Sequence, residues 1–196
     1  IGDALVELGG HRGAFQAFDT MATIQPGVSS YARVAHARML IGDLDGAIAA
    51  ERLAVDAAAE QGEAEAWAHV QLGKLYLARG QFARAGSEYG DAMRAFPNYP
   101  YAYDGLALVA AARGHLKTAA AYEQRATEII PLPQFVATLG DVYQTMGRAT
   151  LARRQYATIS VIERLLRANG VKTDLETALF DADHGRASLV LARRAQ

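Results

Sequence analysis

The stretch that decides the fold begins Trp67-Ala-His-Val-Gln-Leu-Gly-Lys-Leu-Tyr76 and ends at Pro97. Apolar side chains recur in it at helical spacing, as at Leu72 and Tyr76. Gly80 follows them, and glycine commonly ends a helix by taking a left-handed backbone conformation. A second apolar run then leads to Pro97, which cannot continue the hydrogen-bond ladder of a helix. The stretch therefore predicts two helices, A and B, joined by a tight turn.

The same pattern recurs along the chain. A glycine followed five residues later by an alanine occurs at Gly9/Ala14, Gly42/Ala47, Gly80/Ala85, Gly114/Ala119 and Gly147/Ala152. Successive glycines are 33, 38, 34 and 33 residues apart. A repeat of this length indicates stacked helix pairs, because one pair cannot bury both of its faces alone.

Other positions keep register with these glycines. Seven residues before each one stands a small residue, namely Gly2, Ala35, Gly73, Ala107 or Gly140. Nine residues after it stands an aromatic residue in three repeats (Phe18, Tyr89 and Tyr156) and a glutamate in the other two (Glu51 and Glu123). We expect the small residues to let helices A and B approach closely, and the aromatic ring to fill the groove that remains between them.

These motifs resemble the tetratricopeptide repeat family over essentially the whole chain. Residues 67–97 reproduce its Leu-Gly-x₂-Tyr, alanine, aromatic and proline positions, although the tryptophan lies two residues early, and Leu139–Tyr156 match almost as well. The resemblance implies an all-α fold, a right-handed superhelical solenoid of antiparallel helix pairs. We expect one array over 1–196, a fragment of a longer chain, with repeats at about 1–27, 28–62, 63–98, 99–131 and 132–170 and a degenerate sixth at 171–196.

Two intervals are longer than the rest. Gly42 to Gly80 and Gly147 to Gly185 each span 38 residues, and both lack the proline that would stop helix B. Four extra residues make about one helical turn. We therefore expect continuous helix over Ala57–Glu60 and over Arg164–Arg167.

Composition narrows the classes of function. The 196 residues are 51% hydrophobic and 21% charged, which is typical of a globular protein. The absence of cysteine excludes disulfides, thiolate nucleophiles and cysteine-ligated zinc. The net charge of −1 gives no overall basic field, so we expect no nucleic-acid partner despite the basic pairs Arg153/Arg154 and Arg193/Arg194.

The sequence contains no apolar stretch long enough to cross a membrane. We expect no membrane insertion and a soluble protein, cytoplasmic by default, although a chain that opens at Ile1 leaves the presence of a signal peptide open. An excess of alanine, and of arginine over lysine, is typical of a GC-rich bacterial genome.

No arrangement typical of an active site occurs, so we expect neither catalytic residues nor a cofactor nor a metal. His11, His115 and His184 stand beside predicted turns, far apart along the array. His36 and His69 are expected on A helices one repeat apart, and we expect no carboxylate three or four residues from either of them to complete a zinc site. The sequence therefore does not predict an enzyme.

The resemblance implies instead that the A helices line a concave surface that receives a peptide or helix of a partner protein. The family's inward-facing A-helix positions, matched repeat by repeat to this sequence, give the candidate partner-binding residues. These are Arg33, His36, Trp67, Gln71, Lys74, Tyr101, Asp104, Leu108, Asp141 and Gln144. Trp67 and Tyr101 occupy the same repeat position, and we expect them side by side as an apolar anchor, unless they pack between repeats.

Two further functions remain open at this stage. The alternative use of the groove is in a regulatory domain that senses a small ligand or signalling peptide, and the terminal repeats offer a route to self-association. A chaperone-type carboxylate clamp is not expected, because Asp104 stands where the clamp needs a group that attracts a terminal carboxylate. The identity of the partner protein is unknown.

Overall fold

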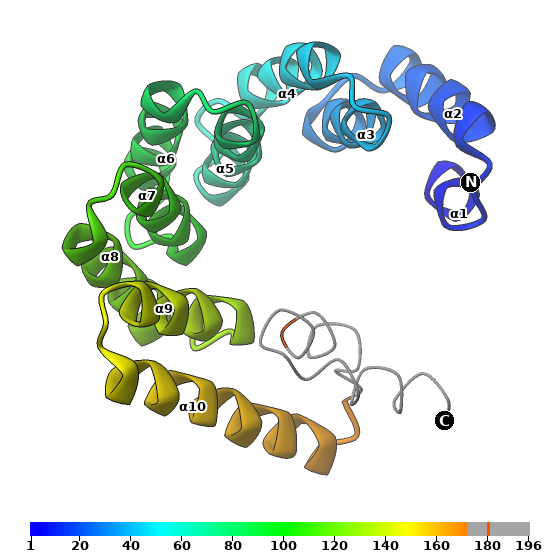
Figure 1. Ribbon diagram of the computed structural model, residues 1–196. Helices are drawn as coiled ribbons and strands as arrows, with labels where there is room; N and C mark the ends of the chain where they lie inside the picture. The colour runs from blue at the N-terminus through cyan, green and yellow to red at the C-terminus, as the bar shows by residue number, and fades with distance from the viewer. Residues whose placement is uncertain (172–179, 181–196) are drawn as a thin grey trace. The chain divides into compact units, whose positions relative to one another are not determined.

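The computed structural model describes residues 1–171 and 180. Within them the chain forms ten α-helices and no strand (Figure 1). It divides into two compact units, Ile1–Ala112 and Arg113–Gln196. The first contains α1 (Gly2–Glu7), α2 (His11–Ile24), α3 (Val28–Leu40), α4 (Leu44–Ala58), α5 (Glu63–Ala78), α6 (Phe82–Ala95) and α7 (Pro100–Ala112). The second contains α8 (Leu116–Ile129), α9 (Pro133–Thr145) and α10 (Ala149–Ala168).

The all-α helix-pair architecture is confirmed. Each of α1/α2, α3/α4, α5/α6 and α9/α10 is an A–B pair of neighbouring antiparallel helices (Figure 1). The fourth repeat contributes α7 to the first unit and α8 to the second. The single array over 1–196 stays a prediction, and the degenerate sixth repeat lies outside the described residues except for Val171 and Phe180.

The marker glycines end the A helices as the sequence predicts. All five have positive φ, between 72° and 81°. At the turn after α5, Gly80 has φ of 72°, and its N–H donates to the Leu77 carbonyl at 2.9 Å. The next residue, Gln81, donates to the Tyr76 carbonyl at 2.9 Å. These bonds satisfy carbonyls that the helix end would leave without donors.

A close contact between a glycine and an aromatic ring sets the spacing within helix pairs. Tyr89 on α6 is fully buried, and Gly73 on α5 and Gly105 on α7 both pack against its ring. A Cβ atom built on Gly73 would lie only 2.5 Å from Tyr89 Cε1. Gly2 packs in the same way on Phe18, and Gly140 on Tyr156. The expected role of the small residues is therefore confirmed.

The repeats with glutamate follow a different rule. In repeats 2 and 4 the small position is alanine, at Ala35 and Ala107, and the aromatic position holds Glu51 and Glu123. An alanine Cβ leaves no room for a ring, as the Gly73 geometry shows, whereas the narrow glutamate chain needs less space between the helices. Both glutamates are buried, at 2% and 0% exposed.

The expectation for the two long intervals is half right. Arg164–Arg167 lies inside α10, so the lengthened helix there is confirmed. Continuous helix over Ala57–Glu60 is wrong, because α4 ends at Ala58 and Glu60 has φ of 64°. No proline stands at this helix end. Instead, the side chain of Gln61 caps it, because its Nε2 donates a hydrogen bond to the Ala57 carbonyl at 2.6 Å.

The extra residues of this interval lie mainly in the next helix. Glu65 Oε2 accepts a hydrogen bond from the Glu60 N–H at 2.9 Å, which stabilises the turn between α4 and α5. Helix α5 then has 16 residues, compared with 13 in α3 and in α7. The added length therefore extends an A helix at its start.

Substituting Gly73 tests the packing rule. We expect Gly73→Ala to lower the free energy of unfolding by about 1–3 kcal/mol, because the new methyl group overlaps the buried Tyr89 ring. The matched control is Gly86→Ala on α6, where the new methyl meets only Val109 Cγ1 at 3.9 Å. That control should be neutral or stabilising by up to about 1 kcal/mol, since alanine favours helix. Urea denaturation of both variants measures the difference in free energy of unfolding. Equal stability of the two variants would refute the claim that the Tyr89 ring requires glycine at position 73.

Candidate functional site

A groove of about 1070 Å³ lies in the first unit. The A helices α3 and α5 supply most of its lining, and α1, α4 and the residues just before α5 and α7 complete it. Five of the candidate residues from the sequence line it: Arg33, His36, Trp67, Gln71 and Lys74. The groove combines an indole, an amide, an imidazole and both signs of charge, which suits the recognition of a polar chain with an apolar anchor.

The other candidates lie elsewhere. Tyr101, Asp104 and Leu108 are on α7 and do not line the groove. Asp141 and Gln144 are exposed on α9 in the second unit, where Asp141 Oδ1 accepts a hydrogen bond from the Tyr156 hydroxyl at 2.7 Å. Burial and this bond raise the pKa of Tyr156. The Asp141 carboxylate therefore takes part in the contact between α9 and α10.

The aromatic lining comes from Trp67 and Tyr99. Trp67 is 38% exposed, a large fraction for an indole. Tyr99, just before α7, is nearly buried, and its ring centroid lies 5.4 Å from that of Tyr101. Tyr101 itself packs against the core of the unit. Tyr99 was not predicted from the sequence, because it precedes the helix and so lies outside the repeat positions from which the candidates were taken.

The two basic side chains of the groove have acidic neighbours. Arg33 Nε lies 3.2 Å from Asp3 Oδ2 on α1. Lys74 is close enough to Asp104 to act on its pKa: burial raises that pKa to about 6, and Lys74 opposes the rise. Much of the positive charge along α3 and α5 is therefore balanced within the protein.

Glu51 is the unusual group of the groove. It projects from α4, is 2% exposed and lines the cavity. Its Oε1 atom is buried and has no hydrogen-bond partner. Burial raises the pKa of this carboxyl to about 7, because the ionised form loses its hydration. The glutamate at an aromatic position was visible in the sequence, but nothing there indicated that it would face a groove.

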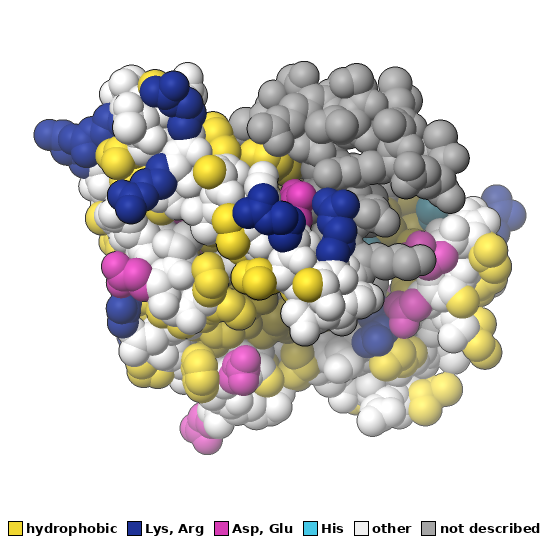
Figure 2. All heavy atoms as spheres, turned by 90° about the horizontal axis from the view of Figure 1, so that it is seen from below, with side chains coloured by type: hydrophobic (Ala, Val, Ile, Leu, Met, Phe, Trp, Pro, Cys, Tyr) yellow, Lys and Arg dark blue, Asp and Glu magenta, His cyan; other side chains and the backbone are white. Residues whose placement is uncertain are grey.

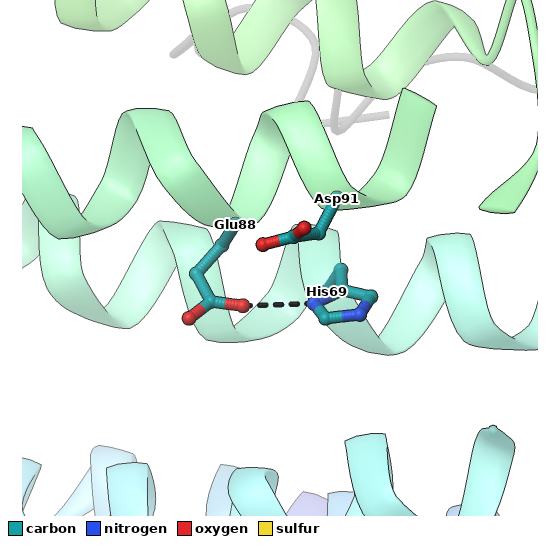
Figure 3. A group of neighbouring side chains, drawn as sticks. All are labelled: His69, Glu88 and Asp91. Carbon is teal, nitrogen blue, oxygen red and sulfur yellow. Dashed lines mark hydrogen bonds and ion pairs between the residues drawn. The ribbon is translucent and has the colours of Figure 1, made fainter. Parts of the chain in front are cut away.

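A second cluster lies between α5 and α6 (Figure 3). His69 Nδ1 is 2.8 Å from Glu88 Oε2, and the ligand atoms of His69, Glu88 and Asp91 all lie within 4.8 Å of one another. Glu65, four residues before His69 in the chain, reaches 4.0 Å from Nε2. The expectation that no carboxylate stands three or four residues from His69 is therefore wrong, since Glu65 stands four residues before it on the same helix.

Within the described residues, these three side chains are the ones that could gather round a metal ion. Their carboxylates already have partners, however, since Glu88 bonds to His69 and Asp91 pairs with Arg94. A hydrogen-bonded pair that joins helix A to helix B accounts for His69 and Glu88 without an ion. The cluster is therefore a weaker candidate site than the groove.

Basic side chains of the described residues do not gather into one continuous patch on the face seen in Figure 2. Lys and Arg side chains occur in separate groups on the face seen in Figure 2, with hydrophobic and uncharged side chains between them. On α10, Arg167 pairs with Glu163 at 3.2 Å. None of the described helices is both long and apolar enough to cross a membrane.

Comparison with known proteins shows the fold. No protein-family model and no curated protein sequence matches this chain. Among solved structures, MamA is 21% identical, with a TM-score of 0.64 over 86% of this chain and 97% of that one. A thermophilic TPR protein of Thermus thermophilus, TTC0263, is 23% identical, with a TM-score of 0.62 over 81% of this chain and 86% of that one. BtubC from P. vanneervenii is 18% identical, with a TM-score of 0.73 over 85% of this chain and 78% of that one.

The raised pKa of Glu51 makes stability depend on pH. The folded state holds this proton more tightly than the unfolded state, so its contribution to stability falls as pH rises from about 4.5 to about 7. Glu51→Gln removes the ionisation, and we expect the variant to be more stable than the parent by about 3 kcal/mol at pH 8, with little difference at pH 4.

Urea denaturation at the two pH values measures this effect. The control is Asp56→Asn, which removes an exposed carboxylate from the same helix. This variant should change in stability between pH 4 and pH 8 by the same amount as the parent. If the difference in free energy of unfolding between Glu51→Gln and the parent stayed constant from pH 4 to pH 8, the pKa of Glu51 would be normal.

Proposed function

We propose that this chain, which has the tetratricopeptide-repeat fold, is a non-enzymatic interaction module that binds a peptide or helix of a partner protein between α3 and α5. The groove carries the proposal. It is lined by two A helices, it holds about 1070 Å³, and a large aromatic side chain stands exposed in it. Such an indole is the kind of anchor that dominates binding energy at protein interfaces.

The polar lining supports a peptide over a purely apolar ligand. Gln71 offers an amide donor and acceptor to a peptide backbone, and His36 adds an imidazole on the neighbouring A helix. Arg33 and Lys74 stand in the same lining and would fix the register of a bound chain more than its affinity. Tyr101, Asp104 and Leu108 on α7 remain proposed contacts for a ligand that extends beyond this groove within the first unit. Asp141 and Gln144 on α9 remain proposed contacts of the second unit, taken by itself.

A selected peptide tests the function. A library of random peptides displayed on phage is selected on the full chain, and the affinity of the best peptide is measured by fluorescence anisotropy. We expect Trp67→Ala to weaken binding by roughly 2 kcal/mol or more while the melting temperature changes little, because Trp67 is partly exposed.

The matched control is Leu53→Ala on α4. Leu53 is 48% exposed and does not line the groove, so its removal should leave the affinity unchanged. A folded Trp67→Ala protein with parental affinity would contradict the proposal. A groove occupied by a second copy of the chain would also contradict it, and sedimentation would show this as a dimer that Trp67→Ala dissociates.

A further inference from the structure

The groove contains one buried acid, Glu51, whose carboxylate has an oxygen that the fold leaves without a hydrogen bond. Glu51 stands where three other repeats place a ring that packs between their helices. Its Oε1 atom has no hydrogen-bond partner, and no ion pair to Glu51 occurs among the described residues. A buried carboxylate oxygen without a hydrogen-bond partner is costly, and buried ionisable groups of this kind are concentrated at binding and catalytic sites.

The groove lining contains more acidic side chains than its own basic side chains neutralise. Arg33 is matched by Asp3, and Lys74 lies near Asp104 outside the lining. Glu63, at the start of α5, also lines the groove and has no ion pair in the described part of the chain. Two acids, Glu51 and Glu63, therefore remain for a positively charged group brought by a ligand.

The aromatic lining favours the same kind of ligand. Trp67 and Tyr99 line the groove together with Glu51. An ammonium or guanidinium group is attracted to the face of an indole or phenol ring, and a charge-assisted hydrogen bond to a carboxylate is stronger than a neutral one. A groove that holds both aromatic rings and a buried carboxylate favours a basic side chain over a neutral or acidic one.

We infer that the groove between α3 and α5 contains a subsite for a lysine or arginine side chain of the bound peptide, with Glu51 as its anionic partner and Trp67 and Tyr99 as its aromatic walls. This inference rests on the proposed function, because it names the peptide that the groove takes. The raised pKa of Glu51 is consistent with it, since burial disfavours the ionised carboxylate until a cationic group is brought beside it.

Peptides chosen by the phage selection test the subsite. We expect them to share a lysine or arginine at one position. Replacing that residue by glutamine, or acetylating the lysine, should weaken binding about tenfold, which is about 1.4 kcal/mol. Glu51→Gln should produce the same loss for the basic peptide and no further loss for the neutral peptide. The modified peptides need no protein variant, so they test the subsite independently of any effect of Glu51→Gln on stability.

The matched control is Glu123→Gln. Glu123 holds the same repeat position and is equally buried, but it does not line the groove, so its substitution should not change the affinity. The selected peptides could bind less tightly to Trp67→Ala, yet share no basic residue and keep their affinity for Glu51→Gln. That result would overturn the subsite and leave the proposed function standing. Failure of Trp67→Ala to weaken any selected peptide would overturn both.

Discussion

The contact of a glycine α-carbon with an aromatic face determines how far apart paired helices lie. Gly73 and Gly105 both pack on the buried Tyr89 ring, so one side chain on α6 fixes the distance to both α5 and α7. Neither glycine has room for even a methyl group. Close-packed interiors of this kind transmit a change in volume to their neighbours, so the register of one pair constrains the next.

The same constraint connects the fold to the groove. Where alanine takes the glycine position, as at Ala35, the ring is lost and Glu51 takes its place. The carboxylate fits between the helices but finds no partner for Oε1. Two residues, Ala35 in place of glycine and Glu51 in place of an aromatic residue, thus put a buried acid where other repeats pack a ring. This acid lines the groove together with the A helices α3 and α5. In this account repeat 2, which departs from the aromatic pattern, supplies the buried acid of the groove, and repeat 3 supplies the indole of Trp67.

The sequence predicted the features that depend on local backbone chemistry. The left-handed glycines, the proline stops and the lengthened α10 follow from residues a few positions apart. The wrong prediction at Ala57–Glu60 has the same origin, because counting residues between glycines cannot show whether an insertion lengthens a helix at its end or the next one at its start. Here Gln61 and Glu65 decided the outcome through hydrogen bonds.

The site was less accessible to sequence reasoning. Repeat positions correctly selected Trp67, Gln71 and Lys74 on α5 as lining residues, but the equivalent reasoning for α7 selected Tyr101, Asp104 and Leu108, which do not line the groove. Tyr99 was missed because it lies in a connection rather than a helix, and Glu51 because burial of a B-helix side chain beside a cavity depends on the neighbouring repeat. Such features arise from packing between segments that are distant in sequence.

Hydrogen–deuterium exchange tests the central claim, that the groove between α3 and α5 is where a partner binds. The exchange of the full chain is compared with and without a saturating selected peptide. The account predicts slower exchange in α3 and α5, with α10 unchanged. Protection confined to α10, or absent from α3 and α5, would contradict it.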